Sequence, residues 1–127
     1  MILNATHAIG WKARDFALQG IDGKSYSLAD VRGPKGTLVV FICNHCPYVI
    51  DTTQEVARAY DAQCTPDFFG FNSKDELQYR GRLDASRMTP IANVRRDLFE
   101  AMKQITETGH GPKDQLPSMG CSIKWKH

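Results

Sequence analysis

Residues 38–42, Leu-Val-Val-Phe-Ile, form an unbroken apolar run within a chain of otherwise mixed character. A short run rich in β-branched and aromatic side chains predicts a strand buried on both faces. The run leads into Cys43, and Pro47 follows four residues later. Proline is favoured at the first position of a helix, where its missing N–H is not needed. The pattern therefore predicts a strand, a tight turn and a helix, with Cys46 at about the N-cap.

The remaining pattern predicts two hairpins and a long C-terminal helix. Asp22-Gly23 is typical of a hairpin turn, and Gly109 is typical of a helix C-terminus. Asp51 is a candidate N-cap, so the helical pattern after Pro47 fits either one helix or two. The predicted strands are 13–18, 25–28, 67–71 and 76–80, and the predicted helices are 27–32, 47–62 and 94–108.

Composition narrows the class of protein. The chain has 127 residues, of which 42% are hydrophobic and 24% charged, and its formal net charge is +2. No basic run forms a nucleic-acid-binding patch, and no stretch is long and apolar enough to span a membrane. The N-terminus does not resemble a signal peptide, which leads us to expect a cytoplasmic, reducing location. Four cysteines in such a compartment favour catalysis, metal binding or burial over structural disulfides.

Cys43 and Cys46 are two residues apart at the predicted start of a helix. Only the thiolate attacks, and a helix N-terminus favours the anion through its unpaired N–H groups and partial positive charge. His45 lies between the two cysteines and, when protonated, would favour the thiolate further. A pair at this spacing can close a disulfide across one turn, so that one thiol attacks and the other resolves. The sequence therefore predicts a dithiol redox centre.

Four segments of the chain carry a family resemblance, namely 13–30, 41–49, 64–69 and 120–126. They resemble peroxiredoxin-like proteins of the AhpC/TSA type, and in particular a bacterial subgroup with a CxxC redox centre. The resemblance implies an α/β, thioredoxin-like fold. Its central mixed sheet would be flanked by helices, with an N-terminal β-hairpin, in a single domain over residues 1–127.

The sequence departs from that family at two points. Arg14 stands where the family usually has proline, and a strand and helix that should follow the CxxC helix are absent between Ile50 and Asp51. A βαβ crossover takes about 30 or more residues, so the sequence predicts that one β-α unit is missing. One straight helix over 47–62 would carry Cys64 to the end of the sheet opposite the dithiol. We therefore expect either that this helix is broken or that a segment is missing.

The resemblance also assigns site residues. It implies catalytic roles for Cys43 and Cys46 and substrate binding by Thr65 and the cis-proline Pro66. His45 is a candidate catalytic neighbour of the thiols or an exposed turn residue. Cys64 and Cys121 are candidate accessory thiols, although a lone cysteine is more often a small buried hydrophobic residue. Which of the paired cysteines is the nucleophile stays open. Laid on Cys46, the peroxiredoxin pattern P-x-x-x-T-x-x-C would require proline at Val39 and threonine at Cys43. Because both are absent, disulfide exchange is favoured over peroxide reduction.

The leading interpretation is therefore a thiol–disulfide oxidoreductase that needs no metal or organic cofactor. Its expected partners are a protein or small-molecule disulfide and an external thiol reductant, and a homodimer stays open. A zinc module is a second class, because the four cysteines and His45 could supply ligands, but only one CxxC is present. A third is a catalytically degenerate scaffold that dimerises through exposed sheet edges.

Overall fold

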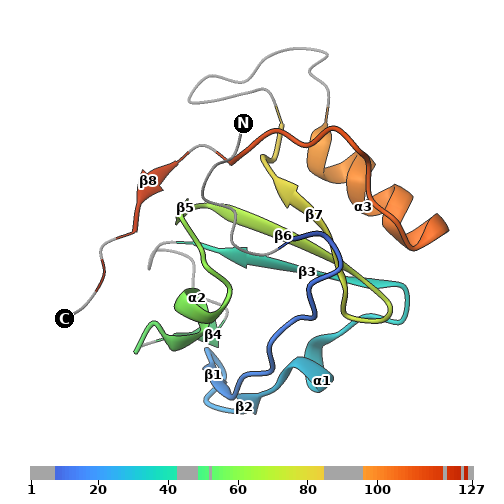
Figure 1. The fold of residues 1–127 in the computed structure, drawn as a ribbon. Helices are drawn as coiled ribbons and strands as arrows, with labels where there is room; N and C mark the ends of the chain where they lie inside the picture. The colour runs from blue at the N-terminus through green and yellow to red at the C-terminus, as the bar shows by residue number, and fades with distance from the viewer. Residues whose placement is uncertain are drawn as a thin grey trace.

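The structure is a computed structural model that describes residues 8–42, 49–51, 53–84, 96–118, 120–123 and 125. Its elements follow the chain in a β-rich order (Figure 1). They are β1 (Leu18–Gly20), β2 (Ser25–Tyr26), α1 (Leu28–Val31), β3 (Gly36–Phe41), β4 (Val49–Ile50), α2 (Glu55–Ala59), β5 (Cys64–Thr65), β6 (Asp67–Asn72), β7 (Leu77–Gly81), α3 (Asp97–Thr108) and β8 (Cys121–Ser122).

The described strands form three small sheets. The central sheet has the order β3-β6-β7, a second has the order β2-β1-β4, and β5 pairs with β8. All described pairs are antiparallel, whereas a mixed central sheet was expected. A parallel neighbour for β3 requires a crossover. Instead β4, the next described strand after β3, joins β1.

Two apolar clusters cover the two faces of the central sheet. On one face, α3 packs its buried Leu98, Ala101 and Ile105 against Phe68 and Tyr79. On the other face, Tyr60 packs with Phe69, Phe71 and Leu77, with Trp11 and α2 beside them. The Tyr60 ring makes edge-to-face contacts with the rings of Trp11, Phe69 and Phe71. Such contacts stabilise a core beyond the area they bury.

Several predicted elements are confirmed. β2, α1, β6, β7 and α3 lie within three residues of their predicted bounds. Ser27 and Asp30 form a capping box at α1, because the Asp30 carboxylate accepts the Ser27 main-chain N–H. Gly109 ends α3 in the left-handed region at φ 80°.

The strand predicted at 13–18 is wrong, because the strand begins only at Leu18. Main-chain groups before it are held by other contacts. The Ala13 N–H donates to the Asp75 carbonyl, and the Asp15 carboxylate accepts the N–H groups of Phe16 and Leu28. These contacts take the place of a ladder over residues 13–17.

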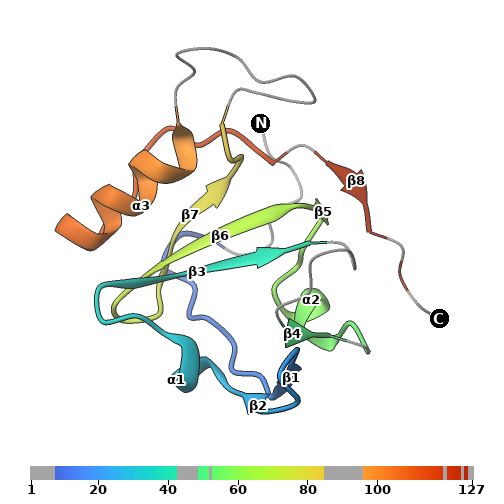
Figure 2. The ribbon, with the colours of Figure 1, turned by 180° about the vertical axis from the view of Figure 1, so that it is seen from behind.

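The strand predicted at 38–42 forms, but it is not buried on both faces. Leu38 is 41% exposed, since β3 is the outermost strand of its sheet. Figure 2 shows β3 at one edge of the central sheet and β7 at the other.

A single helix over 47–62 is also excluded. Val49–Ile50 is a strand, and the helix is confined to Glu55–Ala59. Gln54 has a left-handed φ of 64°, which interrupts a helix, and the Asp51 carboxylate accepts the N–H groups of Val56 and Ala57. Asp51 therefore caps a separate helix, and the broken-helix alternative is confirmed.

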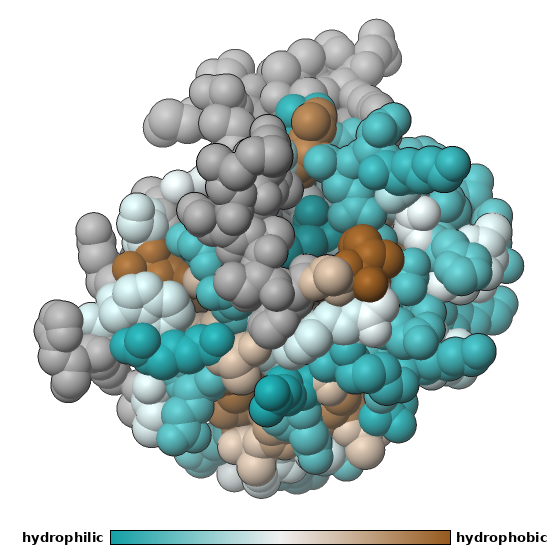
Figure 3. Space-filling model, viewed as in Figure 1, coloured by the Kyte–Doolittle hydropathy of each residue, from teal (hydrophilic) through white to brown (hydrophobic). Residues whose placement is uncertain are grey.

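None of the described helices is long and apolar enough to cross a membrane. On the face shown in Figure 3, the described apolar side chains appear as separate small patches among hydrophilic ones. Patches of that kind are normal for a protein surface in water.

Candidate functional site

The predicted dithiol itself, Cys43, His45 and Cys46, lies outside the described residues. The structure does describe the strand that leads to it. β3 ends at Phe41, so Cys43 follows the end of this strand by two residues in the sequence. The surroundings of the strand end therefore indicate which groups are available near the motif.

The register of β3 against β6 brings the predicted proline segment to this end of the sheet. Phe41 pairs with Asp67, the residue directly after Pro66. The Thr65–Pro66 peptide bond is cis, which confirms the expectation drawn from the resemblance. The strand that precedes the CxxC and the segment that contains Pro66 thus meet at the same end of the central sheet.

Strand β8 brings the C-terminal motif to the proline segment. Cys64 pairs with Ser122, and Thr65 pairs with Cys121. Gly120 lies so close to this segment that a Cβ atom there would be 2.3 Å from the Thr65 carbonyl oxygen. A side chain at this position would therefore force the two segments apart. Two motifs that are far apart in the sequence form one local structure.

The two accessory cysteines belong to these paired strands. Cys64 is partly buried, and its thiol donates to the Pro66 carbonyl over 3.5 Å. The side chain of Cys121 lies outside the described part. Among the described residues, no group of three or more His, Cys, Asp or Glu side chains could hold a metal ion.

A buried ion pair that no local sequence pattern predicted lies beside the same segment. Asp67 and Arg80 are 2% and 9% exposed, and the Asp67 Oδ2 atom lies 3.3 Å from the Arg80 Nη2 atom. Oδ2 also accepts the Gln63 N–H over 2.8 Å, and Nη2 donates to the Asp61 carbonyl over 2.7 Å. The guanidinium stacks on the Phe69 ring, 4.6 Å from its centroid.

This pair ties three segments together, namely the residues before β5, the start of β6 and the middle of β7. A carboxylate at the start of an otherwise apolar strand and an arginine within the next strand were the available signals. Asp67 and Phe69 share a face of β6, and Phe69 pairs with Arg80. The register needed to see this pairing came only with the structure.

Tyr60 supports the same face of the sheet. Its ring is fully buried, and its hydroxyl donates to the Arg14 carbonyl over 2.6 Å. Burial is the main cause that raises the pKa of the Tyr60 phenol, and the charges of Asp75 and Asp15 add to it. The phenol is therefore held neutral well beyond the ordinary tyrosine range.

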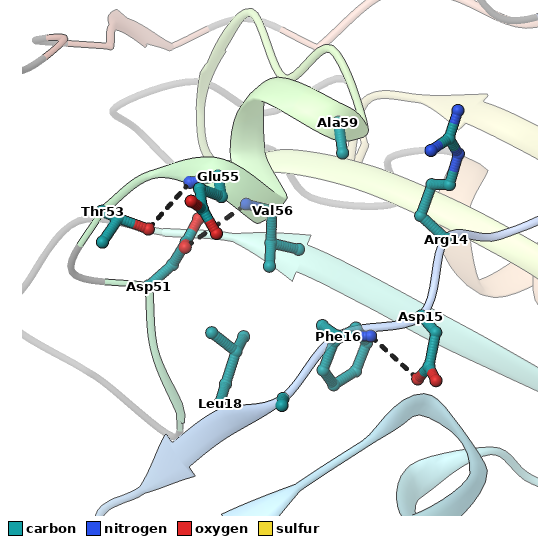
Figure 4. A pocket seen from close by; sticks show the side chains of 10 residues that line it. Arg14, Asp15, Phe16, Leu18, Asp51, Thr53, Glu55, Val56 and Ala59 are labelled. Atoms are coloured by element: carbon teal, nitrogen blue, oxygen red, sulfur yellow. Dashed lines mark hydrogen bonds between the residues drawn. The ribbon is translucent and has the colours of Figure 1, made fainter.

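An open cleft of about 450 Å³ lies between residues 14–18 and the segment from Asp51 through α2 (Figure 4). Its walls combine apolar side chains, such as Phe16 and Val56, with the carboxylates of Asp15, Asp51 and Glu55. Asp15 and Asp51 already accept main-chain hydrogen bonds. These two carboxylates stabilise local structure. One of them, Asp51, directly follows β4 in the sequence.

Comparison with known proteins relates part of the chain to one protein family. A family model for the AhpC/TSA family matches residues 9–62. No curated protein matches the chain significantly.

Two solved structures match over nearly the whole chain. An uncharacterized conserved protein from Geobacillus kaustophilus is 33% identical, with a TM-score of 0.83, and the match covers 94% of this chain and 93% of that one. A hypothetical protein from Sinorhizobium meliloti is 26% identical, with a TM-score of 0.85, and the match covers 95% of this chain and 96% of that one. The chain therefore has a thioredoxin-like fold, is a relative of the Geobacillus protein, and matches the AhpC/TSA family over residues 9–62.

Proposed function

We propose that this protein is a thiol–disulfide oxidoreductase with an antioxidant role, in which Cys43 and Cys46 form the redox-active dithiol. The observation that carries the proposal is the pairing of Phe41 with Asp67. It places the end of the strand before Cys43 at the same end of the sheet as Thr65 and Pro66. A dithiol at this position would have a substrate-binding segment beside it.

The reaction is two successive thiol–disulfide exchanges. One thiolate of the pair attacks a sulfur of the substrate disulfide, the substrate S–S bond breaks, and the leaving thiolate takes up a proton. The second cysteine then attacks the mixed disulfide, which forms the Cys43–Cys46 disulfide and releases the second substrate thiol. Two electrons pass to the substrate, and an external dithiol reductant restores the pair. The chemistry requires no metal or organic cofactor.

Peroxide is the alternative oxidised substrate. There the thiolate attacks a peroxide oxygen, the O–O bond breaks with release of water or an alcohol, and a sulfenic acid forms. The second thiol then condenses with the sulfenic acid to give the disulfide and water. The absence of the peroxiredoxin proline and threonine at Val39 and Cys43 favours the disulfide substrate. In either case we assign to His45 the role of lowering the thiol pKa when it is protonated.

We assign substrate binding to the main chain of Thr65 and to Pro66. In the part of the chain that the structure describes, β8 is the one strand paired with β5. An extended substrate segment would therefore use the other edge of β5. Cys64 and Cys121 lie on the paired strands at this place and are accessory thiols in the proposal. The protein would act in a reducing, cytoplasmic compartment.

Trapping the mixed disulfide tests these assignments. Reduced Cys43→Ser and Cys46→Ser variants are mixed with a peptide that contains one intramolecular disulfide, quenched in acid and weighed by mass spectrometry. We expect one variant to accumulate a stable peptide adduct, because the attacking thiol is present and the resolving thiol is not. The other variant should form none.

Cys64→Ser is the matched control, since it removes a thiol from the same region but leaves the pair intact. It should pass through the adduct and reach the internal disulfide as the wild type does. The proposal would be refuted if the wild type forms its adduct on Cys64 or Cys121 and if Cys43→Ser and Cys46→Ser react with the peptide as the wild type does.

A further inference from the structure

The two edges of the central sheet differ in how far other described segments cover them. The outer edge of β7 is covered by residues 111–118. The Arg80 N–H donates to the Gln115 side chain, the Gln115 amide donates to the Gln78 carbonyl, and the Arg82 N–H donates to the Leu116 carbonyl. Within the described ranges, no strand or loop makes such bonds along the outer edge of β3 (Figures 1 and 2).

The pairing pattern shows which main-chain groups of β3 point away from the sheet. Asn72 directs both its N–H and its carbonyl to the β7 side, where they bond to Glu76 and Asp75. Main-chain groups alternate along an antiparallel strand, so Phe71 and Phe69 direct theirs to β3. Their partners Thr37 and Val39 point back at β6. Leu38 and Val40 therefore present their N–H and carbonyl groups at the outer edge.

The side chains along this edge carry no charge, and all of them except that of Thr37 are apolar. Residues 36–42 contain no acidic or basic residue, and Leu38 and Ile42 are 41% and 38% exposed. Natural proteins usually protect a sheet edge with a charge, a proline or a covering segment. Residues 36–42 supply neither the charge nor the proline. An unprotected edge of this kind is a template for pairing with another strand.

We propose that the outer edge of β3 pairs antiparallel with β3 of a second copy of this chain, which makes one continuous six-stranded sheet. The strand is complementary to itself about a two-fold axis through Val39. Leu38 of one copy then lies opposite Val40 of the other, and each of these residues presents its main-chain groups to the edge. A symmetric interface of this kind is closed, so assembly stops at a dimer.

The same axis keeps the faces of the sheet consistent. Residues directly opposite each other in an antiparallel pair have side chains on the same face. Leu38 and Val40 lie on the face covered by α3, and Val39 lies on the face covered by Tyr60. The α3 helices of the two copies therefore lie on the same face of the continuous sheet. The exposed Leu38 side chains pack where the two copies meet. This inference is independent of the proposed redox function.

The oligomeric state in reducing buffer tests the proposal. Sedimentation equilibrium over a range of protein concentrations should give twice the chain mass of 14.3 kDa. Leu38→Lys places a charge at the centre of the edge on a side chain that is already exposed. We expect it to raise the dimer dissociation constant at least tenfold, because two lysines would face the apolar partner strand. Leu38→Pro, which removes an edge-facing N–H, should act in the same direction.

Ile21→Lys is the matched control, since Ile21 is 67% exposed in the turn after β1, away from β3. It should leave the mass of the dimer unchanged. Circular dichroism verifies that each variant is folded. A wild type that stays monomeric at every concentration, or a Leu38→Lys variant as dimeric as Ile21→Lys, would overturn the proposal. A monomer whose disulfide exchange with peptides is slowed by Leu38→Lys would assign the edge to extended substrates and would also overturn it.

Discussion

Replacing Asp67 with alanine is expected to lower the free energy of unfolding by about 3–5 kcal/mol. The substitution leaves the Arg80 guanidinium buried without its carboxylate and leaves the Gln63 N–H without its acceptor. The Arg80 Nη1 atom is already buried without a hydrogen-bond partner in the described part of the chain, so little compensation is at hand. Urea unfolding of the reduced protein, at one fixed protein concentration, measures the loss.

The ion pair between Arg32 and Asp75 provides a matched control. The Arg32 Nη2 and Asp75 Oδ2 atoms are only 2.6 Å apart, but the Arg32 side chain is 44% exposed. Arg32→Ala should therefore cost less than about 1 kcal/mol. Adding Arg80→Met to Asp67→Ala should recover part of the stability, because the uncompensated charge is removed together with its partner. Equal and small losses for Asp67→Ala and Arg32→Ala would contradict the role given to the buried pair.

Tyr60→Ala should destabilise the protein by about 3–5 kcal/mol, the usual cost of truncating a buried aromatic side chain. The ring is the centre of the aromatic cluster on the face opposite α3, so its loss leaves a cavity among Trp11, Phe69 and Phe71. Tyr60→Phe keeps the ring and removes one hydrogen bond to the Arg14 carbonyl. It should cost only about 1 kcal/mol at neutral pH.

The stabilities of the wild type and of Tyr60→Phe should also differ in their dependence on pH. Burial raises the pKa of the Tyr60 phenol in the folded state. In the unfolded chain the phenol has the ordinary tyrosine pKa of about 10. The contribution of the neutral phenol is thus fully present below about pH 10 and is lost as pH rises further. The free energy of unfolding of the wild type should fall relative to that of Tyr60→Phe by about 1.4 kcal/mol per pH unit above this point. Parallel curves for the two proteins would show that the phenol is not held neutral.

Local patterns predicted most of the elements, because their signals lie within a few residues. The Asp22-Gly23 turn and the glycine after α3 are examples. The run at 38–42 predicted a strand, but not that it lies at an edge. Burial on both faces depends on a neighbouring strand elsewhere in the chain, and no local pattern encodes that neighbour.

The candidate site was predicted only in part for the same reason. The cis form of the Thr65–Pro66 bond followed from resemblance, while the pairing of Thr65 with Cys121 and the Asp67–Arg80 ion pair depend on long-range register. Around the junction of Ile50 and Asp51 the structure has a strand, β4, and a separately capped helix, α2. The helix is separate because Gln54 adopts a left-handed conformation. That one β-α unit is missing stays a prediction.

The equilibrium reduction potential of the protein tests the central claim most directly. Wild type, Cys43→Ser and Cys46→Ser are equilibrated in dithiol–disulfide buffers of graded potential, and the internal disulfide is quantified by the mass of alkylated thiols. The proposed function predicts a single two-electron transition in the wild type and in Cys64→Ser, and its complete loss in both Cys43→Ser and Cys46→Ser. A reversible internal disulfide that persists in both of those serine variants would contradict it.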